Sequence, residues 1–185
     1  VLKNDRKAAQ KILSAYLNLL TVYPDQPYDQ PEVIHPITGM PIVTPKSCGD
    51  FSRLFPKEEK VLELVRQKTA LEIVKAAIQN GERALIYTSW VRTDSQQKLL
   101  KLLQENGYRT EILAPQIATE KREEWVDKRV KNGLQVLITN PRCVETGLDL
   151  NAFTTIIFYS MGYNLFTMRQ ASRRSWRINQ TAPRV

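Results

Sequence analysis

The sequence predicts an α/β fold in which helices cover both faces of a doubly wound parallel sheet. From residue 57 onward, short and uniformly apolar runs alternate with segments of helical periodicity. Such runs are typical of strands buried on both faces, and strand–helix–strand units join their strands by right-handed crossovers. The first 56 residues lack this alternation. We therefore expect two parts, an N-terminal helix with a proline-rich accessory segment in residues 1–56 and an α/β domain in residues 57–185.

In the first part, apolar residues recur at helical spacing over residues 3–20, which predicts an amphipathic helix. The sequence leaves open whether its apolar stripe packs on the core or on a preceding domain. Residues 21–56 hold seven of the ten prolines. This density excludes a helix or a central strand, so we expect an ordered accessory loop or an insertion.

Four helices and four strands are expected in the second part. The helices are predicted over residues 57–80, 93–105, 119–132 and 165–176. The strands are predicted over residues 84–90, 108–114, 135–139 and 154–159. In such sheets ligands gather at the carboxyl ends of the strands, and here these ends carry polar or aromatic residues. They are Thr88, Ser89 and Trp90 at the end of the first strand, Thr139, Asn140 and Arg142 at the end of the third, and Ser160 at the end of the fourth.

Composition and charge narrow the class of protein. The chain has 185 residues, 42% of them hydrophobic and 25% charged, as in ordinary globular domains, and a formal net charge of +8. The last 26 residues contain five arginines and no acid, which suits a polyphosphate or a nucleic-acid backbone. Cys48 and Cys143 lie far apart, which favours a reducing cytoplasm. The single His35 argues against a multi-histidine metal site, and no apolar run approaches the roughly 20 residues of a membrane span.

One stretch cannot be explained by packing alone, the run QASRRSWRINQ from Gln170 to Gln180. In a continuous helix, Gln170, Arg173, Arg174 and Arg177 share one face. Like charges at this spacing cost roughly 0.2–0.5 kcal/mol per pair, so an anion should offset them. The guanidinium fork matches phosphate oxygens two at a time, which points to a triphosphate. The alternative is a solvated basic face near a helix C-terminus.

This run resembles motif VI of superfamily 2 helicases, most closely the Q-A-x-x-R-x-H-R-I-G-Q form of the Swi/Snf-type DNA translocases. The resemblance implies the second of two RecA-like domains, with arginines presented to the γ-phosphate of ATP. By position, Arg177 would be the catalytic arginine finger and Arg174 its phosphate-binding companion. Gln170 and Arg173 would be nucleotide-binding residues.

Two positions depart from the motif VI pattern. Trp176 stands where histidine is usual, and Asn179 stands where glycine is usual. Neither departure removes an essential charge.

Residues 136–150, VLITNPRCVETGLDL, resemble motif V of the same superfamily. By position, Thr139, Asn140 and Arg142 would contact the nucleic acid. Gly147 and Asp149 would face ATP, with Asp149 near the ribose. Asp149 is closer to DEAD-box usage, because Swi/Snf-type chains usually have asparagine there. Without the neighbouring motif, a conformational glycine and a turn aspartate would explain this stretch equally well.

The run ALIYTSW, residues 84–90, resembles motif IV, in which hydroxyl groups at the strand tip touch phosphates. Thr88 and Ser89 would make these contacts. Trp90 would either stack on a base or cover the sheet edge, and we favour covering.

The chain contains neither a Walker A loop nor an Asp-Glu-x-His or Asp-Glu-x-Asp box. The resemblance therefore implies that ATP binds with Mg²⁺ held by an N-terminal RecA-like domain preceding Val1. The expected function is the C-terminal lobe of an ATP-dependent helicase or translocase, and this chain alone should not hydrolyse ATP. Its expected partners are a DNA or RNA backbone and the N-terminal domain. The alternative function is a non-catalytic nucleic-acid-binding or scaffolding module.

Overall fold

A computed structural model describes residues 2–22, 32–43, 61–89, 95–144, 147–160, 162 and 164–176. The chain forms two compact units, Val1–Arg66 and Gln67–Val185. The boundary expected between residues 56 and 57 stays a prediction, because it lies outside the described residues. No helix among the described residues is long and apolar enough to cross a membrane.

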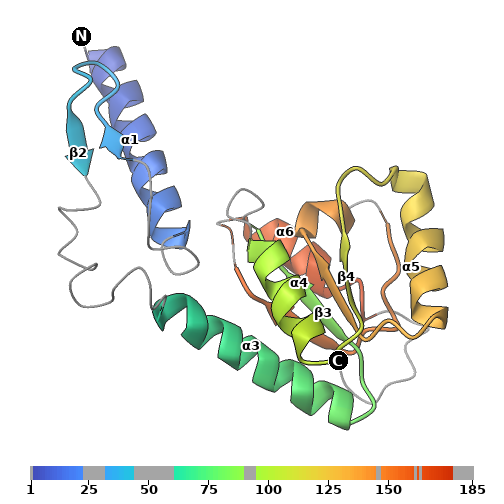
Figure 1. The fold of residues 1–185 in the computed structure, drawn as a ribbon. Coiled ribbons are helices and arrows are strands. Elements are labelled where there is room, and N and C mark those ends of the chain that lie inside the picture. The colour runs from blue at the N-terminus through green and yellow to red at the C-terminus, as the bar shows by residue number, and fades with distance from the viewer. Residues whose placement is uncertain are drawn as a thin grey trace. The chain divides into compact units, whose positions relative to one another are not determined.

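The first unit contains a long helix and a two-stranded hairpin (Figure 1). The helix predicted over residues 3–20 is confirmed as α1 (Leu2–Val22). The strands β1 (Val33–Ile34) and β2 (Pro41–Val43) are antiparallel. Residues of α1 and of the hairpin line an apolar groove of about 320 Å³, namely Ala9, Ile12, Leu13, Tyr16, Val33 and Ile42.

The hairpin turn explains how a proline-rich stretch holds regular structure. The His35 ring nitrogen Nδ1 accepts hydrogen bonds from the backbone N–H groups of Ile37 and Thr38, at 3.3 and 3.2 Å. Gly39 adopts a φ of +69°, which favours glycine. Pro36 lies in the turn and Pro41 begins a strand, positions that tolerate a missing N–H.

The second unit contains a four-stranded sheet, and all four predicted strands are confirmed. They are β3 (Ala84–Tyr87), β4 (Thr110–Leu113), β5 (Val136–Thr139) and β6 (Thr155–Phe158). Their spatial order is β4-β5-β3-β6, and every pairing is parallel. The remaining elements are α3 (Val61–Gln79), α4 (Ser95–Glu105), η2 (Thr119–Lys121), α5 (Arg122–Lys131), η3 (Pro141–Val144) and α6 (Leu165–Ser172).

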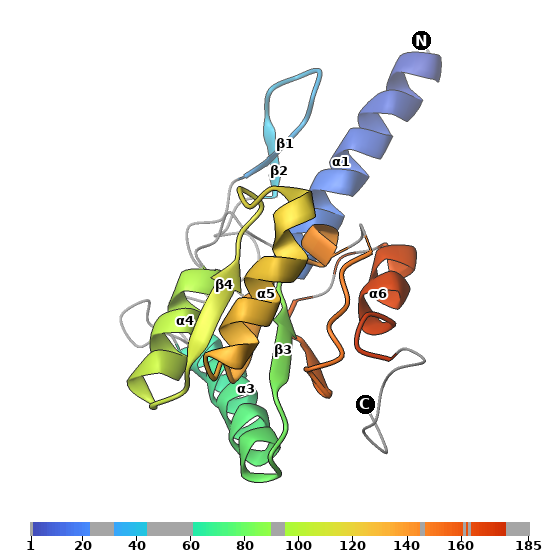
Figure 2. The same ribbon diagram turned by 90° about the vertical axis from the view of Figure 1, so that its right-hand side faces the viewer.

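Helices cover both faces of this sheet (Figures 1 and 2). One face packs on α3 and α4 through a cluster that includes Val74, Ile86 and Leu99. The other face packs on α5 and α6 through a cluster that includes Leu85 and Phe153. This arrangement confirms the predicted doubly wound α/β class.

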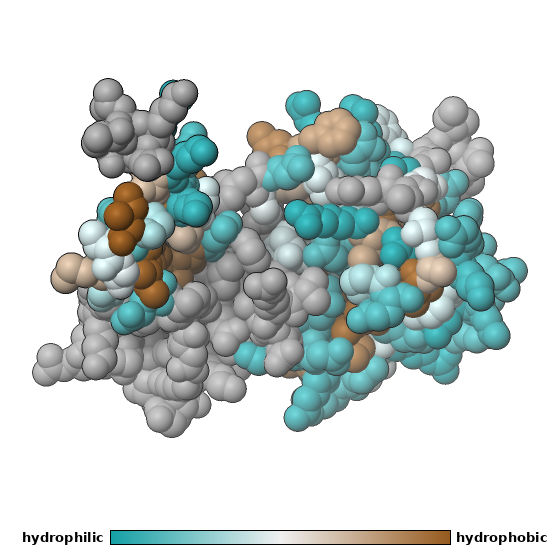
Figure 3. All heavy atoms as spheres, turned by 90° about the horizontal axis from the view of Figure 1, so that it is seen from above, coloured by the Kyte–Doolittle hydropathy of each residue, from teal (hydrophilic) through white to brown (hydrophobic). Residues whose placement is uncertain are grey.

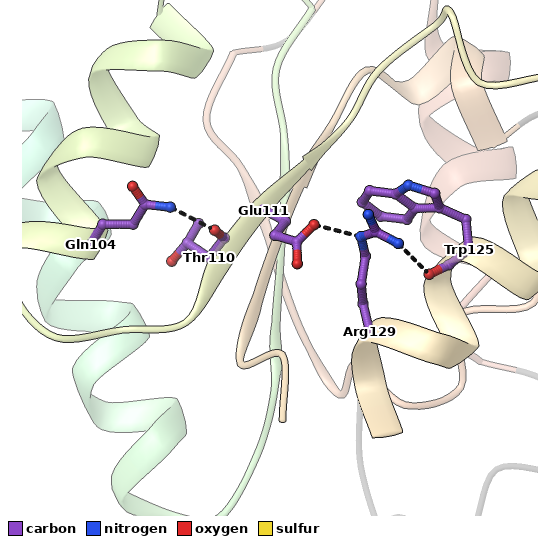
Figure 4. Close-up of polar contacts among 5 residues, drawn as sticks. All are labelled: Gln104, Thr110, Glu111, Trp125 and Arg129. Carbon is purple, nitrogen blue, oxygen red and sulfur yellow. Dashed lines mark hydrogen bonds and ion pairs between the residues drawn. The ribbon is translucent and has the colours of Figure 1, made fainter. Parts of the chain in front are cut away.

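Side chains from the two flanking helices support the edge strand β4 from opposite sides (Figure 4). Gln104 of α4 donates from Nε2 to the backbone oxygen of Thr110 at 3.1 Å. Arg129 of α5 donates to the carboxylate of Glu111 and lies 3.6 Å from the centre of the Trp125 ring. The Thr110 carbonyl lies on the outer side of an edge strand, where no neighbouring strand supplies a donor. The amide of Gln104 supplies this hydrogen bond instead.

Candidate functional site

Hydrogen bonds tie together the carboxyl ends of three strands. Ser89, which follows β3, donates from its backbone N–H to the Ser160 hydroxyl at 2.8 Å. The Ser89 hydroxyl donates to the backbone oxygen of Ser160 at 3.0 Å. Asn140, which follows β5, donates from Nδ2 to the backbone oxygen of Ser89 at 3.2 Å. The fold therefore brings together polar residues that the sequence places on separate strands.

The two threonines assigned to nucleic-acid contact lie deeper. The Thr88 hydroxyl accepts a 2.7 Å hydrogen bond from Nε2 of Gln96, and the Thr139 hydroxyl donates to the Leu113 backbone oxygen at 3.2 Å. Both side chains are fully buried. Their contact with a phosphate backbone stays a prediction. Trp90, assigned to the same surface, lies outside the described residues.

The turn after β5 is fixed from within by Asn140. Its Oδ1 accepts the Arg142 backbone N–H at 3.0 Å, and its backbone oxygen accepts the Cys143 N–H at 2.8 Å. Arg142 is exposed on this turn, as a group that grips phosphates would have to be.

Arg122, the first residue of α5, holds the same turn from the other side. Its guanidinium donates to three backbone oxygens, those of Cys143 (2.8 Å), Ile117 (2.9 Å) and Pro115 (3.2 Å). The loops after β4 and β5 are thereby joined through one side chain. Arg122 could not be singled out from the sequence, because nothing in its spacing distinguishes it from the other charged residues of α5.

The loop carrying Gly147 and Asp149 begins with an unusual backbone angle. Gly147 is exposed and has a φ of +95°, where any L side chain is strained although no atom would lie within 4 Å of its Cβ. The backbone conformation alone is therefore sufficient to explain why a glycine stands at position 147. Asp149 is half-buried, and the nucleotide contact of both residues stays a prediction.

The arginine-rich helix is shorter than predicted. It begins at the N-cap Asn164, whose Oδ1 accepts the N–H groups of Phe166 (3.1 Å) and Thr167 (3.2 Å), and it ends at Ser172, not at residue 176. Residues 173–175, which we call the arginine turn, leave the helix. The prediction that the helix continues to residue 176 is therefore wrong, and the single helical face expected for a continuous helix does not extend beyond the C-cap Arg173.

Tertiary contacts explain why the helix stops. The Ala171 backbone oxygen accepts the Arg174 N–H at 3.2 Å, a bond of the tighter i→i−3 kind. The backbone oxygen of Arg174 accepts the N–H of Leu150 at 3.1 Å, which fastens the arginine turn to the loop after Gly147. Arg173 points into solvent while Arg174 is half-buried. Arg177, the predicted finger, lies outside the described residues.

Tyr87 supports the arginine turn from inside the sheet, and it is not among the residues predicted for the site. Its hydroxyl donates to the backbone oxygen of Ala171 at 3.0 Å, and its side chain is fully buried. Burial raises the pKa of Tyr87 above its usual value, and the positive charge of Arg174 opposes part of this rise. A signal was present, because a tyrosine in a strand buried on both faces needs a partner for its hydroxyl.

The raised pKa of Tyr87 predicts alkaline sensitivity. Above about pH 10 the unfolded chain loses this proton while the folded protein retains it, so stability falls as pH rises, by about 1.4 kcal/mol per pH unit from this group. Tyr87→Phe lacks the effect. In urea unfolding from about pH 9 to about pH 11, the stability advantage of the wild type over Tyr87→Phe should shrink. A constant difference would contradict the assignment.

The charge around the arginine turn fits an anionic ligand. No acidic residue occurs from Ser160 to the end of the chain, and Arg169 and Arg173 are exposed. Most of the described surface on the face shown in Figure 3 is hydrophilic, with hydrophobic residues in small separate patches. Exposed guanidinium groups can donate to phosphate oxygens, and the binding of a nucleotide by these residues stays a prediction.

A parallel sheet in the order β4-β5-β3-β6, with helices on both faces and polar residues at its carboxyl ends, defines a RecA-like α/β lobe. Residues 61–179 match the family model described as the helicase conserved C-terminal domain. The chain belongs to this family of helicase C-terminal domains.

Solved structures resemble this lobe at low sequence identity. The C-terminal part of the Fun30 ATPase domain matches with a TM-score of 0.58 and 20% identity, over 63% of this chain and 38% of that chain. The Pyrococcus furiosus Hef helicase domain matches at 0.47 and 17%, over 71% and 28%. T4 UvsW matches at 0.47 and 14%, over 66% and 26%. No curated protein sequence matches. The chain thus spans well under half of each structure.

Proposed function

We propose that this chain is the C-terminal lobe of an ATP-dependent, Swi/Snf-like translocase that acts on DNA. The observation that carries this proposal is the bond from Leu150 N–H to the Arg174 backbone oxygen. It joins the loop assigned to motif V to the arginine turn assigned to motif VI. A motor needs such a link, because events at the nucleotide must reach the nucleic acid.

On the nucleotide side, Arg177 and Arg174 donate to the oxygens of the γ-phosphate and stabilise the charge that develops during phosphoryl transfer. Gln170 and Arg173 contact the nucleotide from the same segment, and Asp149 lies near its ribose. ATP supplies the phosphoanhydride bond that is hydrolysed. An N-terminal RecA-like domain would hold its Mg²⁺.

On the nucleic-acid side, Asn140, Arg142 and Ser89 form the surface that grips the backbone, together with the strand ends at Thr88 and Thr139. Asn140 contributes by holding this surface together, since it donates to the Ser89 backbone oxygen and accepts the Arg142 N–H within its own turn, and exposed Arg142 contributes charge. Backbone gripping of this kind makes binding tolerant of sequence and weaker as the salt concentration rises.

A second candidate function is a nucleic-acid-binding scaffold without ATP turnover. The observation that favours it is Trp176, which is 73% exposed at the position where the motif usually has histidine. An exposed indole can stack on a base, as in sequence-tolerant binding of single strands. The sequence upstream of this lobe discriminates the two functions, since only the motor requires a Walker A loop.

The test is ATP hydrolysis by the intact protein, measured with and without duplex DNA. The translocase predicts turnover that duplex DNA stimulates, and negligible turnover by residues 1–185 alone. Binding of DNA without any hydrolysis would replace the motor by the scaffold. Hydrolysis by the purified 185-residue chain would refute the assignment of the Walker motifs to another domain.

A further inference from the structure

We propose that Tyr87 is a positioning residue, which sets the backbone of Arg174 and so the direction in which the Arg174 side chain leaves the arginine turn. This inference rests on the proposed function, since it assigns a role in the same phosphoryl transfer. Tyr87 itself does not contact the nucleotide; it acts through Arg174.

Tyr87 and Arg174 are connected through a shared hydrogen-bond acceptor. The Ala171 backbone oxygen accepts both the Tyr87 hydroxyl, at 3.0 Å, and the Arg174 N–H, at 3.2 Å. A carbonyl oxygen has two lone pairs, so both donors can be satisfied at once. The Tyr87 hydroxyl therefore fixes the Ala171 oxygen relative to β3. The N–H of Arg174 is held in place because it donates to the same oxygen.

A second bond fixes the other end of the same residue. The backbone oxygen of Arg174 accepts the Leu150 N–H at 3.1 Å. Arg174 is thus held at its N–H through Ala171 and at its carbonyl through Leu150. With both backbone groups fixed, the Cα–Cβ bond of Arg174 has a set origin and direction before any ligand arrives, which contributes to preorganised electrostatic stabilisation.

The phenol that makes the first of these contacts is itself immobile. Tyr87 lies in the interior strand β3, is fully buried, and stacks on Phe158 with ring centres 5.3 Å apart and an interplanar angle of 26°. Its ring cannot rotate away without opening the core. A phenylalanine would fill the same space and lose only the hydroxyl.

Electrostatics agree with this geometry. The Arg174 charge lowers the pKa of Tyr87 against the larger opposing effect of burial, so the guanidinium lies within electrostatic reach of the phenol. The raised pKa keeps the hydroxyl protonated, and it therefore remains a donor at neutral pH.

The test is a double-mutant cycle on ATP hydrolysis by the intact protein, with Tyr87→Phe, Arg174→Ala and their combination. Tyr87→Phe is expected to lower kcat roughly 3- to 10-fold, the effect of one hydrogen bond, while KM for ATP changes less than about twofold. In the Arg174→Ala background the same change should have no further effect. Tyr108→Phe, the same chemical change at the amino end of the sheet, is the control and should leave kcat unaltered.

Amide hydrogen exchange tests the positioning without reference to activity. In the 185-residue chain, Tyr87→Phe should speed exchange of the Arg174 N–H about tenfold by weakening its local protection, and leave the amide of Leu137 in β5 unchanged. Unaltered exchange at Arg174, or equal losses of kcat in both backgrounds, would overturn the inference. Absence of hydrolysis by the wild type would instead refute the proposed function, and the exchange measurement would still decide whether Tyr87 positions the turn.

Discussion

Replacing Arg177 by alanine is expected to lower kcat for ATP hydrolysis by the intact protein about 10³- to 10⁵-fold, as loss of an arginine finger does. The reason is that the guanidinium donates to oxygens that gain negative charge only during the transfer, so its loss raises the barrier more than it weakens binding. Arg177→Lys should recover little, because an ammonium group lacks the planar fork.

Arg184→Ala provides the matched control, since it removes the same charge from the same basic segment outside the motif. It should leave kcat within about twofold of the wild type, and DNA binding should persist in both variants. A comparable loss of kcat from Arg184→Ala would show that net charge, and not a finger at residue 177, supports turnover. DNA binding lost together with hydrolysis in Arg177→Ala would assign this arginine to the nucleic-acid track.

Replacing Phe153 by alanine should lower the free energy of unfolding of the 185-residue chain by about 3–5 kcal/mol. Phe153 is fully buried in the same cluster as Leu137, Leu150 and Ala171, and its N–H donates to the Leu150 backbone oxygen at 3.0 Å. Truncation therefore leaves a cavity directly beneath the loop that holds the arginine turn. Urea unfolding followed by circular dichroism measures the change.

Phe166→Ala is the control for the stability measurement, because this phenylalanine is 70% exposed on α6. Its effect should stay within about 0.5 kcal/mol. A loss for Phe153→Ala below about 1 kcal/mol would mean that the loop relaxes to fill the cavity, and that the cluster does not depend on this ring.

The sheet could be predicted from the sequence because its strands are short apolar runs whose ends are marked by polar residues or glycine. Ala84, Leu85 and Ile86 have no exposed surface, and a short run of such residues that follows a glycine is typical of a strand buried on both faces. Gly81 and Gly107, with φ of +76° and +84°, end the preceding helices where the sequence indicated. The polar strand ends at Ser89, Asn140 and Ser160 followed from the parallel topology.

Features that depend on distant contacts could not be predicted. The helix at Arg173 looks continuous in the sequence, but two bonds from residues far away in the chain, Tyr87 and Leu150, hold the segment that leaves it. The three carbonyl bonds of Arg122 likewise reach two loops that only the fold brings together. The β1–β2 hairpin was missed because proline density argues against central strands and says little about a two-stranded one.

The bond between Leu150 and Arg174 joins a backbone N–H to a backbone carbonyl, so it does not depend on the identity of either side chain. Any residue that retains its N–H at position 150 can supply the donor, and proline alone among the common residues cannot. The mechanical link between these loops can therefore persist while the side chains around it diverge. Preserving this bond therefore requires no paired change between positions 150 and 174.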